Sequence, residues 1–128
     1  MSYYMSRTLE SGFDEAVSRT IEEFKHEGFG VLTEIDAKEK LKEKLGVEFR
    51  NYKILGMCNT PYAYRALQAE DKIGVMLPCS VVVQEAGKGR VEVAAIDPIA
   101  AMQAVGNPEL EELAAEVTEK IRRAIERL

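Results

Sequence analysis

The two cysteines are the residues of this sequence best suited to unusual chemistry. Cys58 lies in the segment ILGMCN, residues 54–59, and Cys79 lies in MLPCS, residues 76–80. Thiolates are nucleophiles and ligands for soft metals. Cysteine is also among the residue types most often buried for packing alone. Each thiol is therefore a candidate site residue and, equally, a candidate core residue.

The position of Cys58 favours reactivity. It is expected to end a strand over residues 52–58, and Thr60 and Pro61 read as the N-cap and first residue of the helix that follows. A thiol at that point would lie near the positive end of the helix dipole, which favours the thiolate. Asn59 lies between the strand and the helix, so we group it with Cys58.

The position of Cys79 favours packing. The alternation of residues 75–85 predicts a long strand that places Cys79 on an apolar face with Leu77 and Val81. Pro78 cannot donate to a sheet ladder, which predicts an edge, a bulge or a break there. If Cys58 and Cys79 face each other across the sheet, together they could take a soft metal, an electrophile or a reversible disulfide. The spacing lacks C-x-x-C and an adjacent histidine, so no metal site is predicted.

A base for a cysteine nucleophile is hard to find. His26 is the one histidine, and we expect it on a solvated helix face near a C-terminus. Asp97, before Pro98, is expected to cap a turn. The glycine-containing segments 28–30 and 87–89 are too short for phosphate-binding loops.

Bulk properties limit the classes of function. The 128 residues are expected to form a single domain, residues 1–128. With 17 basic and 22 acidic residues, the net charge of -5 argues against a nucleic-acid partner. No apolar run approaches the ~20 residues that span a bilayer, and the N-terminus lacks a signal-peptide core. We therefore expect a cytoplasmic protein, not a membrane protein, with reduced cysteines.

The elements that must position these residues follow from periodicity and capping signals. Strands are predicted at 3–9, 31–35, 52–58, 75–85 and 90–96. Helices are predicted from Ser11 to Gly28, from Asp36 to Gly46, from Thr60 through Leu67, and from Asn107 to the end, with a short helical turn through Met102. This order, with its hairpin at 86–89, predicts an α+β fold with a mainly antiparallel sheet. A doubly wound parallel sheet is the alternative.

Several segments together resemble the family called domain of unknown function 302. They are residues 52–59, 65–67, 73–83 and 95–98, and residues 28–36 fit its N-terminal part. The resemblance implies an α+β fold with helices on one side of a curved antiparallel sheet, and a homodimer. It supplies no established activity, and any cofactor is unknown. The cysteine positions agree with the family pattern, but Thr60 separates Asn59 from Pro61 and Ser80 replaces an expected asparagine.

These observations lead to one hypothesis and two alternatives. We expect a small cytoplasmic binding or sensing module, dimeric, with a ligand-binding site around Cys58, Asn59 and Cys79. Its small-molecule ligand would be a thiol-reactive molecule, an oxidant or a soft metal. The first alternative is an enzyme that uses Cys58 as nucleophile, with His26, Asp97 or a tyrosine as base. The second is a structural protein with core cysteines, whose exposed sheet face contacts a partner.

Overall fold

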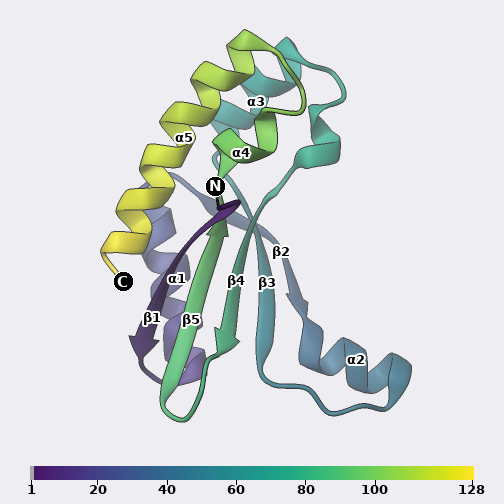
Figure 1. Ribbon diagram of the computed structural model, residues 1–128, viewed down its shortest axis with the longest axis vertical. Coiled ribbons are helices and arrows are strands. Elements are labelled where there is room, and N and C mark those ends of the chain that lie inside the picture. The colour runs from purple at the N-terminus through teal and green to yellow at the C-terminus, as the bar shows by residue number, and fades with distance from the viewer. Residues whose placement is uncertain (1) are drawn as a thin grey trace.

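A five-stranded antiparallel sheet forms the frame of the molecule (Figure 1). The computed structural model describes residues 2–128. The strand order is β1-β5-β4-β3-β2, and each neighbouring pair is antiparallel. The strands are β1 (Tyr4–Glu10), β2 (Gly30–Asp36), β3 (Tyr52–Cys58), β4 (Cys79–Glu85) and β5 (Arg90–Ile96). The predicted α+β class is confirmed, and the parallel alternative is wrong.

The helices occupy three places around this sheet (Figure 1). Helices α1 (Phe13–His26) and α5 (Pro108–Glu126) pack against each other and cover one face. Helices α3 (Thr60–Ala69) and α4 (Pro98–Met102), with the 3₁₀ helix η1 (Ile73–Met76), gather beyond one end of the sheet beside the start of α5. Helix α2 (Ala37–Leu45) projects from the opposite end and has no buried residue. The second face of the sheet therefore stays open.

The core lies between the covered face and helices α1 and α5. Alternate strand residues point into it, such as Val81 and Val83 of β4, which are fully buried. Opposite them, α1 and α5 present stripes at helical spacing, with Phe24 and Ile121 completely enclosed. A second, smaller cluster around Ile73, Leu110 and Leu113 fills the space among η1, α3, α4 and α5.

Most predicted caps are present because they depend on local chemistry. Asp36 accepts a hydrogen bond from the backbone N–H of Glu39, and Asn107 accepts one from that of Glu109. The predicted cap at Ser11 is wrong: Gly12 is the N-cap of α1, and the Ser11 hydroxyl bonds instead to the Gly12 carbonyl.

The predicted strand over 75–85 is too long. Residues 73–76 form η1 instead, and β4 begins only at Cys79, directly after a cis Leu77–Pro78 peptide. The interruption expected at Pro78 is confirmed, because a residue without an N–H lies outside the ladder, just before the first paired strand residue.

Candidate functional site

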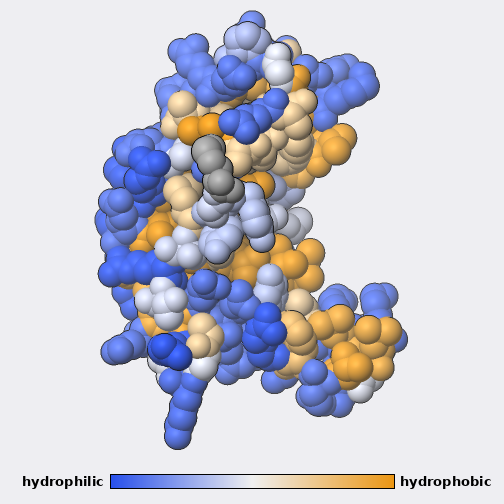
Figure 2. All heavy atoms as spheres, in the orientation of Figure 1, coloured by the Kyte–Doolittle hydropathy of each residue, from blue (hydrophilic) through white to orange (hydrophobic). Residues whose placement is uncertain are grey.

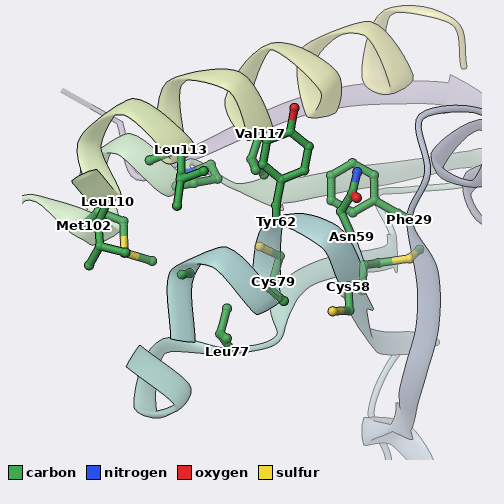
Figure 3. A pocket seen from close by; sticks show the side chains of 15 residues that line it. Phe29, Cys58, Asn59, Tyr62, Leu77, Cys79, Met102, Leu110, Leu113 and Val117 are labelled. Carbon is green, nitrogen blue, oxygen red and sulfur yellow. The ribbon is translucent and has the colours of Figure 1, made fainter. Parts of the chain in front are cut away.

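A small cavity lies where the ends of β3 and β4 meet helices α3, α4 and α5 (Figure 3). Its volume is about 60 Å³. The residues that line it are apolar or uncharged: Phe29, Met57, Cys58, Asn59, Tyr62, Ala63, Ala66, Leu77, Cys79, Pro98, Met102, Leu110, Leu113, Ala114 and Val117. All three residues predicted for the site therefore line one cavity.

Asn59 fixes the junction between β3 and α3. The residue is 9% exposed, and its Nδ2 donates a 3.0 Å hydrogen bond to the backbone carbonyl of Glu27 at the end of α1. Gly28 adopts a positive φ of 90°, and a Cβ there would lie 3.1 Å from Asn59 Nδ2. Glycine thus allows the amide to lie close against the turn that ends α1.

The start of α3 differs from the prediction by one residue. Asn59, not Thr60, is the N-cap, and its side chain makes no capping hydrogen bond. Thr60 is the first helical residue and Pro61 the second. Cys58 is the last residue of β3, as predicted, and its thiol is free and partly buried.

Cys79 opens β4 and carries a strongly perturbed thiol. Burial raises the pKa of Cys79 to about 11, and the neighbouring Cys58 adds to this rise. Cys79 is therefore a neutral thiol at pH 7. Neutral thiols are poor nucleophiles, so Cys79 offers packing and a weak hydrogen-bonding group.

The two cysteines are neighbours without facing each other. The strand register pairs Cys79 with Met57, one residue before Cys58. Successive side chains leave a strand on opposite sides, and in Figure 3 the two sulfur atoms point in different directions. The hypothesis that the thiols oppose each other directly is therefore wrong, although both belong to the cavity wall.

The packing at Gly56 holds this end of β3 against Pro78. A Cβ at Gly56 would overlap Thr33 Oγ1 and lie 2.8 Å from Pro78 Cγ. Only glycine leaves room for both neighbours on the open face of the sheet.

The candidate bases are engaged elsewhere. His26 lies on an exposed surface of α1 beside the Glu22 and Glu23 carboxylates, at 3.3 and 3.5 Å. Asp97 accepts from the Ile99 N–H and caps α4, as predicted.

Tyr62 lines the cavity, but its hydroxyl donates to Glu116 at 3.3 Å. Burial first, and then Glu116, raise the pKa of Tyr62. Within residues 2–128 there is no cluster of three or more His, Cys, Asp or Glu side chains that could hold a metal ion.

Comparison with known families identifies the chain. The family model described as "Domain of unknown function DUF302" matches residues 5–128. The protein belongs to this family. The resemblance seen in the sequence is confirmed, and the family is one of unknown function.

A solved DUF302 structure shares the fold. It is described as the crystal structure of an uncharacterized conserved DUF302 protein from Bacillus stearothermophilus, and it is 30% identical with a TM-score of 0.91. The likeness covers 99% of this chain and 98% of that one. No curated protein gives a significant match. Within residues 2–128, every helix is too short or too polar to cross a membrane.

Part of the cavity wall of this DUF302 chain was missed by sequence reasoning. Four of its residues come from α4 and α5, 44 to 59 positions after Cys58 in the sequence: Met102, Leu110, Leu113 and Val117. The sequence feature that could have indicated this space was a pair of small residues, Ala63 and Ala66, one turn apart on α3. Small side chains on a packed helix face leave space that larger ones would fill.

Proposed function

We propose that this DUF302 protein is a small-molecule binding or sensing module of the cytoplasm. The site is the cavity at the β3–α3 junction, with Cys58, Asn59 and Cys79 in its wall. The observation that carries the proposal is that these three residues line one apolar cavity. Well-formed apolar pockets with a few polar groups are the usual form of ligand sites.

The two thiols limit the kinds of ligand that this cavity could bind. Cys79 is held as a neutral thiol by burial, which raises its pKa, so Cys58 is the thiol available to an electrophilic or oxidising ligand. A soft cation fits less well, because an uncharged wall gives a buried cation no compensating charge. A cysteine-dependent enzyme is the weaker alternative, since His26, Asp97 and Tyr62 have other partners.

Filling the cavity tests the proposal. Ala66 lies in its wall, and Ala66→Leu would place a larger side chain in the space a ligand needs. Ala115→Leu makes the same change at an exposed position of α5. In titrations with furan, followed by amide NMR shifts, we expect cavity residues to respond in the wild type and in Ala115→Leu. Ala66→Leu should bind furan at least about tenfold more weakly, which corresponds to a loss of about 1.4 kcal/mol of binding free energy.

Folding of the variants is checked by thermal unfolding. Filling a cavity commonly stabilises a protein by about 0.5–2 kcal/mol. If Ala66→Leu overpacks and unfolds, Ala63→Val is the smaller filling change. Absence of shifts at cavity residues in the wild type, or unchanged shifts in a folded filled variant, would reject this site.

We also propose that the open face of the sheet is a homodimer contact. The register aligns Ile35, Ile54, Val82 and Ala94 in one row across four strands. A hollow of about 420 Å³ lies over the same face, lined by residues that include Tyr4, Tyr52 and Val82. A continuous apolar row on an uncovered sheet is typical of an interaction surface.

A further inference from the structure

The cavity wall contains no acidic, basic or histidine side chain. Burial keeps the thiol of Cys79 in its neutral form. A charged group placed there would lose its hydration without gaining an opposite charge. The occupant must therefore be neutral in the part that enters.

Asn59 supplies an acceptor of known orientation. The Glu27 carbonyl can only accept a hydrogen bond, so the amide nitrogen of Asn59 must face it and Oδ1 must be the other atom. No hydrogen bond to Oδ1 is formed within residues 2–128, and the side chain does not cap α3. Oδ1 keeps some contact with solvent, because Thr118 Oγ1 is the only fully buried side-chain nitrogen or oxygen without a partner within residues 2–128. An acceptor that makes no hydrogen bond within the chain can take a donor from an occupant.

The space available limits the size of the occupant. One water needs roughly 10–15 Å³ of such volume, so a cavity of about 60 Å³ holds a group of about four to six water-sized atoms. That is the size of a short alcohol or a five-membered ring.

We propose that the cavity takes a small neutral molecule with one hydrogen-bond donor, a short alcohol or a five-membered N–H heterocycle, that donates to Asn59 Oδ1. The inference rests on the proposed function, because it assigns a class of non-covalent ligand to that same cavity, separate from any reaction at Cys58. The apolar wall binds the carbon skeleton, and Asn59 selects the donor. Molecules of the same shape without a donor leave Oδ1 unpaired, which weakens their binding.

Pyrrole, furan and N-methylpyrrole test this selection. Pyrrole and furan have the same ring size, but pyrrole alone carries an N–H, and methylation removes that donor. We expect titrations of the wild-type chain, followed by amide NMR shifts, to show pyrrole binding roughly 3- to 10-fold more tightly than furan. N-methylpyrrole, which lacks the N–H, should not show the tighter binding expected of pyrrole.

Variants locate the acceptor. Asn59→Leu should remove the preference for pyrrole while furan still binds, and Asn51→Leu, the same change near the start of β3 at the far end of the sheet, should keep the preference. If Asn59→Leu fails to fold without its bond to Glu27, the three-probe comparison on the wild type decides alone. Equal binding of pyrrole and furan at the cavity would overturn the inference and leave the proposed function standing. No binding by any of the three would overturn both.

Discussion

Burial determines the chemistry of Cys79. Its thiol begins β4 beside Met57 and lines a cavity without charged side chains. Desolvation penalises the thiolate there, which raises the pKa from its ordinary value of 9.0 to about 11. Cys58, one residue beyond Met57, lies in the same wall, and a negative charge on either sulfur would disfavour one on the other. The two thiols are therefore unequal, and the pair should not be treated as two equivalent nucleophiles.

The raised pKa predicts a loss of stability in alkaline solution. In the folded state the Cys79 thiol stays protonated up to about pH 11, whereas in the unfolded chain it ionises near pH 9. The free energy of unfolding therefore falls as the pH rises between these values. The loss due to Cys79 is at most about 2–3 kcal/mol. Denaturant unfolding at several pH values measures it, and the difference between wild type and Cys79→Ala isolates it.

Two other groups also contribute to the dependence of stability on alkaline pH, so a control is needed. The pKa values of Lys53 and Tyr62 are also raised, the first mainly by its hydrogen bond to Glu34 and the second mainly by burial. Cys58→Ala keeps these groups and the burial of Cys79, which is the larger cause of its raised pKa, and should therefore retain most of the wild-type slope. Parallel curves for wild type and Cys79→Ala would show that burial does not control this thiol.

At the scale of elements, Glu27 joins three parts of the structure. Its carboxylate accepts hydrogen bonds from Arg123 and Arg127 of the α5 end, and its backbone carbonyl accepts from Asn59. The side chain is 10% exposed, in contrast to most surface ion pairs of this protein. The contact between α1 and α5 is thereby linked to the junction that forms the cavity.

We predict that Glu27→Gln lowers the melting temperature at pH 7. The hydrogen bond from Arg123, followed by that from Arg127, lowers the pKa of Glu27 below 4.5 in the folded state. The carboxylate therefore stabilises the fold above that value, and the benefit is lost as the pH falls through the folded pKa. The melting temperatures of wild type and variant should converge in acid. Glu43→Gln removes an exposed pair with Lys40 and should change little; an equal effect of both changes would contradict the role of Glu27.

Elements that depend on nearby residues could be predicted from the sequence. The way in which elements far apart in the sequence come together could not. The Asp36 and Asn107 caps depend on chemistry within three residues, and both were found in the sequence. The alternation of residues 75–85 predicted a strand, so η1 was missed, because apolar spacing alone does not separate a 3₁₀ turn from extended chain. Cys58 was placed correctly at its junction. The cavity beside it needs α4 and α5, whose approach is set by tertiary packing.

At the scale of the whole molecule, the covered and open faces of the sheet are sharply different. Helices α1 and α5 enclose one face, whereas no helix within residues 2–128 covers the apolar row through Ile54 and Val82 on the other. Nearby, Leu45 and Val47 around the end of α2 are 69% and 44% exposed, and Figure 2 shows hydrophobic residues gathered over this projecting end. Such surface is costly in water unless a partner covers it.

A homodimer through this face predicts a specific response to a single charge. Val82 lies between Ile54 and Ala94 in the row, so Val82→Glu would bring two carboxylates into a desolvated contact and should weaken dimerisation at least about tenfold, measured by sedimentation equilibrium. Val75→Glu adds the same charge on η1, where the side chain is 88% exposed, and should leave the dimer intact. Each chain carries a net charge of -5, so added salt should strengthen association by screening repulsion between the copies. If the wild type is monomeric, this dimer does not form. If the two glutamate substitutions weaken dimerisation equally, the contact lies elsewhere.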